Sequence, residues 1–259
     1  MLLRITQKVV LVLLSLICLS EAFGIDICTQ LKYVHADCLL NVPLQVLLKD
    51  ISLLSIGCNQ NLDIARDVGY FAGMVARSYG FNYVAFGTLD TLDELDPNPV
   101  DRISRSPYIT AQVITYLAEG FVNSGVIPVV NATGNIDAEV VRALVNRKAI
   151  YPSLVESENK IQKLIDLGYE TVFVLVDGSV KGKLPNLRID TKVNLSEIEQ
   201  IRKKVLEGAI VLLSRSEEII NVNQPFSKTG VLVFSNEEWL LEQAKEVIRG
   251  SRIPTGRAP

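Results

Sequence analysis

The chain has 259 residues, 48% of them hydrophobic, and a formal net charge of −3 at pH 7. That length suits one domain of barrel size or two small ones. The mild acidity, with no basic cluster interleaved with aromatic residues, argues against nucleic acid as a partner. With one histidine and no CxxC pair among its four cysteines, the sequence does not favour a zinc site, and no cofactor is expected.

Residues 1–22 are expected to form a cleaved secretory signal peptide rather than an uncleaved anchor. Arg4 and Lys8 precede an apolar run of eleven residues, about half of what spans a bilayer. Small residues then stand at the −3 and −1 positions of a cleavage site after Ala22. The prediction is a secreted or periplasmic protein whose single domain, residues 23–259, has no transmembrane span.

Three cysteines remain after cleavage: Cys28, Cys38 and Cys58. An exported chain can form one disulfide, and Cys28–Cys38 is the compact pairing, which would leave the third thiol free or buried. The only histidine, His35, is interpreted as an ordinary polar residue near the N-terminus.

Amphipathic helical patterns alternate with short apolar runs from about residue 60 onward. The spacing of apolar residues predicts helices over 61–80, from 106, from 137, and over 157–168, 195–208 and 236–249. Strands are expected at 81–89, 126–130, 171–176, 209–214 and 230–235, with weaker candidates at 46–56 and 149–155.

Several residues are expected to begin or end these helices. Pro107 suits the first helical position, Gly80 a C-terminal cap, and Ser196 with Glu199 a capping box. Residues 250–259 are expected to be a frayed tail.

Apolar runs separated by amphipathic helices are typical of a parallel sheet covered on its faces. The clear strands are fewer than the eight that close a barrel. The predicted fold is therefore α/β, with TIM-barrel-like (β/α) repeats in an incomplete or degenerate barrel.

Several stretches together resemble the N-terminal barrel domain of family 3 glycoside hydrolases, and most of all the bacterial β-N-acetylhexosaminidases. The likeness follows, in the family's order, residues 61–100, 107–130, 187–214 and 228–239. The first stretch ends in Asn98-Pro99-Val100, which is similar to an Asn-Pro-Val element of the family.

The resemblance implies a sugar site whose key residues are replaced here. The family has a Lys-His pair after the strand 126–130, and this chain has Val130 and Asn131 at those positions. The family's second histidine acts with an aspartate as acid/base; Asn135 replaces the histidine, whereas Asp137 matches the aspartate. The family's arginine after Asn-Pro-Val is matched, with shifted spacing, by Arg105 or by Arg102.

The family nucleophile is the aspartate of a Ser-Asp pair at a strand end, where this chain has Ser235-Asn236. A retaining glycosidase forms an ester between a carboxylate and the anomeric carbon, which a neutral amide cannot do. Asparagine at position 135 also lacks a group that titrates near neutral pH. The resemblance therefore implies a catalytically inactive relative that binds carbohydrate, such as a cell-wall amino sugar, or serves as a scaffold.

Two other interpretations stay open. Asp90 and Asp177 follow predicted strands, so relocated carboxylates, with Asp137, could still hydrolyse O-glycosyl bonds. Asp137 and Asn236 also suit helix N-caps, and Ser235 with Glu238 would make a capping box. A structural or interaction protein is the third possibility, with a partner or a second copy covering open sheet edges.

The sequence thus gives candidate binding positions rather than a catalytic set. They are Asp90, Arg105, Asn131 and Asp177.

Overall fold

The computed structural model describes residues 39–40, 47–48, 51–93, 96, 99–176, 180–181, 195–218 and 226–257. The predicted signal peptide, the Cys28–Cys38 pairing, His35 and Asp177 lie outside the described residues. None of the helices in the described part has the length and apolarity that crossing a bilayer requires.

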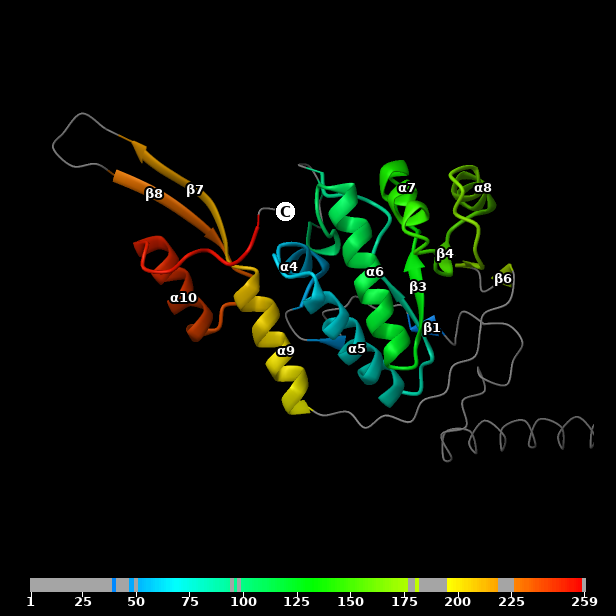
Figure 1. The fold of residues 1–259 in the computed structure, drawn as a ribbon, viewed down its shortest axis with the longest axis horizontal. Coiled ribbons are helices and arrows are strands. Elements are labelled where there is room, and N and C mark those ends of the chain that lie inside the picture. Colours follow the sequence, from blue (N-terminus) through cyan, green and yellow to red (C-terminus); the bar gives the residue numbers. More distant parts are fainter. Residues whose placement is uncertain are drawn as a thin grey trace, which may run out of the picture.

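A sheet with its strands in chain order forms the centre of the fold (Figure 1). Its strands are β1 (Leu39–Leu40), β2 (Tyr83–Phe86), β3 (Ile127–Asn131), β4 (Ser153–Val155), β5 (Phe173–Leu175) and β6 (Val180–Lys181). Strands β1 to β5 are parallel, and β6 is antiparallel to β5. The α/β class is therefore confirmed. Among the described strands the sheet is an open row, so closure into a barrel stays a prediction.

The helices between the strands are α5 (Asp63–Ser78), α6 (Pro107–Asn123), α7 (Ala138–Asn146) and α8 (Glu158–Asp166). In Figure 1, α5 to α8 follow one another in chain order, as successive βα units require. The weak strand candidate at 149–155 is confirmed as β4, whereas β1 lies in a part of the sequence where no strand was predicted.

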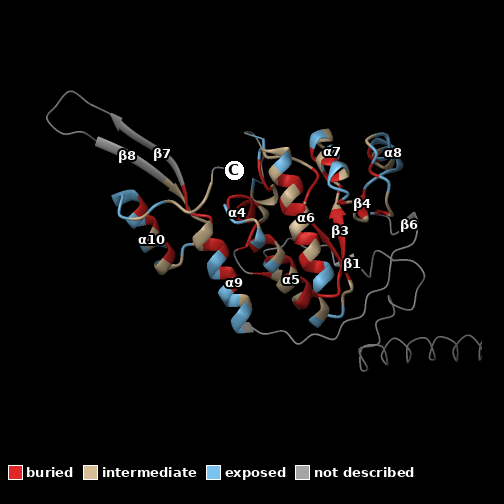
Figure 2. Ribbon diagram, viewed as in Figure 1, coloured by how far each residue is buried: buried red, intermediate tan, exposed pale blue. Residues whose placement is uncertain are grey.

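Both faces of the sheet are buried, which explains why its strands are continuously apolar. Along β2, Val84 and Phe86 pack in the main core with the helices, whereas Tyr83 and Ala85 point to the opposite face. Figure 2 shows the buried residues along β3 and on one side of α5 and α6.

The predicted helix ends on this side of the molecule are largely confirmed. Ser106 caps α6 by accepting a hydrogen bond from Ile109 N, and Pro107 is its first helical residue. Gly80, which follows α5, has a φ of 87°, a conformation that glycine adopts without the steric cost of a side chain.

Helix α4 (Leu53–Gly57) corrects the strand candidate at 46–56. Ser52 Oγ accepts from Ser55 N, and Ser55 Oγ accepts from Ser52 N. These reciprocal serine bonds form a capping box that satisfies the amides of Ser52 and Ser55, and so favour a helix at this point.

The C-terminal part contains α9 (Leu195–Gly208), β7 (Val211–Glu218), β8 (Phe226–Leu232) and α10 (Glu238–Arg249). The strands expected at 209–214 and 230–235 are not part of the parallel sheet: β7 and β8 pair only with each other, antiparallel, among the described strands. Parallel neighbours need a crossover of about a dozen residues or more, and the chain between these two is too short for one. Figure 1 shows this hairpin extending away from the sheet beside α10.

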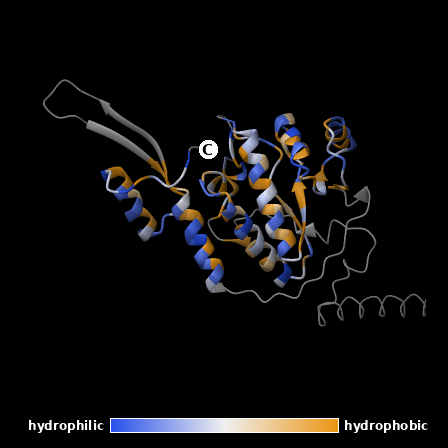
Figure 3. Ribbon diagram, viewed as in Figure 1, coloured by the Kyte–Doolittle hydropathy of each residue, from blue (hydrophilic) through white to orange (hydrophobic). Residues whose placement is uncertain are grey.

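Two expected capping boxes in this part are wrong. Helix α9 begins at Leu195, so Ser196 lies inside its first turn. The N-cap of α10 is Glu237, which makes no side-chain cap bond, so Asn236 does not cap the helix. The alternation of polar and apolar residues along α9 and α10 is visible in Figure 3.

The tail is not frayed up to residue 257. Gly256 N donates to Ile210 O (2.8 Å), and Arg257 N donates to Cys58 O (2.7 Å). Arg257 Nε also donates to Gly57 O (3.0 Å). We call residues 254–257 the C-terminal strap, because they tie the start of β7 to the end of α4.

Candidate functional site

Two loops at the carboxyl ends of β2 and β3 are joined by side-chain hydrogen bonds. Asn135 Nδ2 donates to Asp90 Oδ1 (3.2 Å), and Thr91 Oγ1 donates to Asp137 Oδ2 (2.9 Å). The carboxyl ends of parallel strands are where α/β proteins bind ligands. We call Asp90, Thr91, Arg102, Asn135 and Asp137 the strand-end cluster.

Arg102 supplies the positive charge of the cluster. Its Nε lies 2.8 Å from Asp96 Oδ2 and 3.4 Å from Asp90 Oδ2. The Nε–H is not aligned for a hydrogen bond with either oxygen, so these are ion pairs without a directed bond. The side chains of Arg102, Asp90 and Asp96 are 23%, 14% and 5% exposed, so solvent screens their attraction only in part.

Asp137 is confirmed as the N-cap of α7. Its Oδ1 accepts from Glu139 N (2.8 Å), while its Oδ2 accepts from Thr91. Its own amide donates to Leu89 O (2.8 Å), which fixes the start of α7 against the loop after β2. Both carboxylate oxygens are therefore engaged by hydrogen-bond donors.

Two lysines of α8 hold the loop between β3 and α7. Lys160 Nζ donates to the carbonyl oxygens of Thr133 and Gly134, and pairs with Glu156 at 2.8 Å. Lys163 Nζ donates to Ile136 O (2.9 Å). The loop that carries Asn135 is thus fixed from α8 as well as from the sheet.

Asn131, at the end of β3, stabilises the same loop from within. Its Oδ1 accepts from the amide of Thr133 (3.0 Å) and from the Thr133 hydroxyl (2.7 Å). The amide oxygen of Asn131 is therefore engaged in hydrogen bonds within this turn. Asn135, in the same loop, is exposed to solvent.

The structure brings together four of the predicted site residues, Asp90, Asn131, Asn135 and Asp137, in two adjacent loops. Arg102 is the arginine that pairs with Asp90, whereas Arg105 is exposed at the turn before α6. Asn236 is exposed between β8 and α10, and it takes no part in the hydrogen bonds that join Asp90 to Asp137. Asp177 lies outside the described residues.

The contribution of α8 was not foreseen from the sequence. Lys160 and Lys163 stand at helical positions i and i+3 directly after β4, the next strand of the sheet. Residues three apart share a helix face, so this spacing was the available signal. It could be read only once β4 had been placed beside β3.

A carboxylate does occur next to Asn236, but it joins two helices. The carboxylate of Glu237 accepts from the Arg202 guanidinium and from Trp239 Nε1. Arg202 also pairs with Glu199 at 3.0 Å, and its side chain is only 5% exposed. These contacts tie α9 to the start of α10 and make Glu237 a structural residue.

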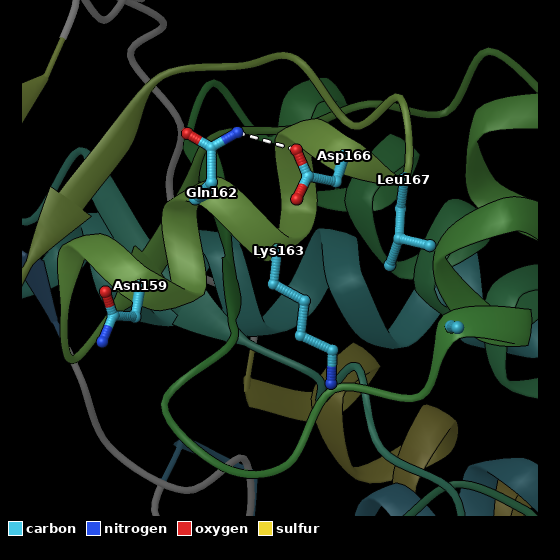
Figure 4. A pocket seen from close by; sticks show the side chains of 6 residues that line it. Asn159, Gln162, Lys163, Asp166 and Leu167 are labelled. Atoms are coloured by element: carbon cyan, nitrogen blue, oxygen red, sulfur yellow. Dashed lines mark hydrogen bonds between the residues drawn. The ribbon is translucent and has the colours of Figure 1, made fainter.

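A surface pocket of about 380 Å³ lies between α7 and α8 (Figure 4). It is lined by Ala138, Asn159, Gln162, Lys163, Asp166 and Leu167. Gln162 Nε2 donates to Asp166 Oδ1 (2.7 Å), and Lys163 reaches toward the loop carbonyl of Ile136. This pocket lies on the outer helices, whereas the strand-end cluster lies at the carboxyl ends of parallel strands, where α/β proteins bind ligands, so the cluster is the better candidate.

The cluster offers one amide (Asn135), one hydroxyl (Thr91) and carboxylate oxygens, which are groups that can bind sugar hydroxyls. It has no imidazole that could move a proton near neutral pH. Within the described ranges, no group of three or more His, Cys, Asp or Glu side chains could hold a metal ion.

Comparisons with known proteins assign no family to the chain. No family model matches it, and no match was found among curated proteins or among solved structures. The strand-end cluster and its contacts are therefore the basis on which a function can be assigned.

Proposed function

We propose that this chain is an exported, non-catalytic relative of family 3 glycoside hydrolases that binds carbohydrate at the strand-end cluster. The chain-order parallel sheet supports a TIM-barrel-like ancestry, because successive βα units of a barrel give the same strand order. The ligand class is an amino sugar of the kind found in cell walls.

The observation that carries the proposal is the engagement of both acids. Asp90 Oδ1 accepts from Thr91 N (3.0 Å) and from Asn135, and Asp90 Oδ2 faces Arg102. Both oxygens of Asp137 are engaged by Glu139 N and Thr91. A glycosidase nucleophile must present a carboxylate oxygen to the anomeric carbon, and its acid must deliver a proton to the leaving oxygen. Acids whose oxygens are already held by groups of the protein support the non-catalytic part of the proposal.

Binding and cleavage can be tested on the same purified mature protein. Titration calorimetry with chitotriose should give saturable binding that weakens when Asn135 is changed to Ala, because the exposed amide is lost from the cluster. A nitrophenyl N-acetylglucosaminide should release no nitrophenol. Glu170→Gln, an exposed change at the opposite end of the sheet, is the matched control.

The alternative, an active hydrolase with relocated carboxylates, is tested by the same assay. Nitrophenol release that disappears in Asp90→Asn would assign catalysis to the strand ends and overturn the non-catalytic proposal. Absence of both binding and cleavage would overturn the proposed sugar site itself.

A second candidate is an interaction role, and the hairpin favours it. Strands β7 and β8 pair only with each other among the described strands, so each has an open edge. Open edges of this length invite pairing with another chain. Sedimentation analysis of the mature protein should then show a dimer or larger, and a monomer at all concentrations would count against this role.

A further inference from the structure

We infer that the strand-end cluster selects against sugars that carry a carboxylate, so that its ligand is a neutral or cationic amino sugar. This inference rests on the proposed sugar site and names the charge class of its ligand. The distinction matters chemically, because cell-wall sugars include neutral N-acetylglucosamine units and units that bear a carboxylate.

The cations around the cluster are already committed to the protein. Arg102 pairs with Asp96 and Asp90. Lys160 binds two loop carbonyls and Glu156, and Lys163 binds the carbonyl of Ile136. A bound carboxylate would have to displace one of these contacts, which would leave a carboxylate or a carbonyl without its partner.

The negative charges outnumber the cations in the same place. Asp90 and Asp96 both pair with Arg102, and Glu156 pairs with Lys160. The carboxylate of Asp137 is held by the Glu139 amide and the Thr91 hydroxyl, with no cation paired to it in these contacts. Glu139 pairs with Arg142 at 2.5 Å. An anionic ligand therefore meets repulsion from partly buried acids. At physiological salt this repulsion is largely screened only beyond a distance of about 8–10 Å.

Shape must be separated from charge in the test. N-acetylmuramic acid and its methyl ester have nearly the same shape but differ by one negative charge. We therefore compare the N-acetylglucosaminyl-N-acetylmuramic acid disaccharide with its methyl ester by titration calorimetry on the full mature protein, with chitotriose as the neutral reference. The same titrations at low salt and at 0.5 M salt (where the screening length is about half that in physiological salt) distinguish repulsion from steric exclusion.

The ester is expected to bind at least about tenfold more tightly than the acid at low salt, a difference that corresponds to about 1.4 kcal/mol. The ratio of the ester's affinity to the acid's affinity should fall toward one at high salt. Asp137→Asn should also lower this ratio, because asparagine keeps the N-cap geometry but removes one negative charge. Glu170→Gln removes one exposed charge at the opposite end of the sheet and should leave the ratio unchanged.

The outcomes separate the inference from the function it rests on. Two results would overturn charge selection while the sugar site stands. In the first, chitotriose binds and the acid binds as tightly as the ester; in the second, chitotriose binds but neither the acid nor the ester does. If none of the three sugars binds, the proposed function is overturned and the inference with it.

Discussion

Replacing Gly120 with alanine should push apart α5 and α6, which pack against each other in the core beside the sheet. An alanine Cβ at this position in α6 would lie 2.1 Å from Arg66 O and 2.6 Å from Tyr70 N, both backbone atoms of α5. Carbon atoms in favourable contact are about 3.5–4.0 Å apart. The backbone of α5 cannot rotate away as a side chain could, so the helices must separate by about 1 Å.

The magnitude follows from two opposing effects. Overpacking a close contact costs about 1–3 kcal/mol, and contact with backbone puts this site at the upper end of that range. Alanine in place of glycine inside a helix gains about 1 kcal/mol. We therefore expect the free energy of unfolding to fall by about 2 kcal/mol.

Urea denaturation followed by circular dichroism measures this change. With a slope of about 2–3 kcal/mol per molar urea, the midpoint should move down by about 0.7–1 M while the slope stays the same. Gly134→Ala is the matched control, because no atom lies within 4 Å of the added Cβ, and it should leave the midpoint unchanged. The reasoning is refuted if Gly120→Ala is as stable as the wild type.

Three further predictions concern the cap, the thiol and the strap. Asp137→Ala should lower the free energy of unfolding by about 1 kcal/mol in thermal melts. Asp137→Asn should stay close to wild type, because asparagine can still cap α7. Equal losses of stability in both variants would contradict the cap role. Burial raises the pKa of the Cys58 thiol to about 12, so thiol reagents should not modify it in the native state at pH 8. The folded chain keeps this proton at a pH where the unfolded chain loses it, so the free energy of unfolding should fall as pH rises from about 9 toward 12; a slope unchanged in Cys58→Ala would count against this. Arg257→Ala, which removes the side-chain bond of the C-terminal strap to Gly57 O, should cost about 1–2 kcal/mol, and unaltered urea stability would show that the strap is held by its backbone alone.

The sequence predicted the elements of the parallel sheet because their signals are local. The stripe of apolar residues in α5, Ser106 and Pro107 before α6, and Asp137 before α7 all specify helix positions without reference to the rest of the chain. The capping function of Asp137 followed from its place alone, and the structure confirms it.

The C-terminal part, from α9 onward, was predicted less well because its signals are not local. An apolar run such as residues 209–214 fits a parallel strand and a hairpin strand equally, and only the chain between β7 and β8 decides. The partners of Asp90 also depend on neighbouring loops, so its pairing with Arg102 could not be obtained from the spacing of residues. The spacing of Lys160 and Lys163 becomes informative only once β4 is placed beside β3.

The most direct test of the account is an amide chemical-shift titration of the isotope-labelled protein with chitotriose, with the sugar recovered afterwards for mass spectrometry. We predict saturable shifts centred on the two loops at residues 88–92 and 131–137, and a trisaccharide that is recovered intact. Shifts confined to other parts of the chain, or recovery of shorter sugars, would contradict it.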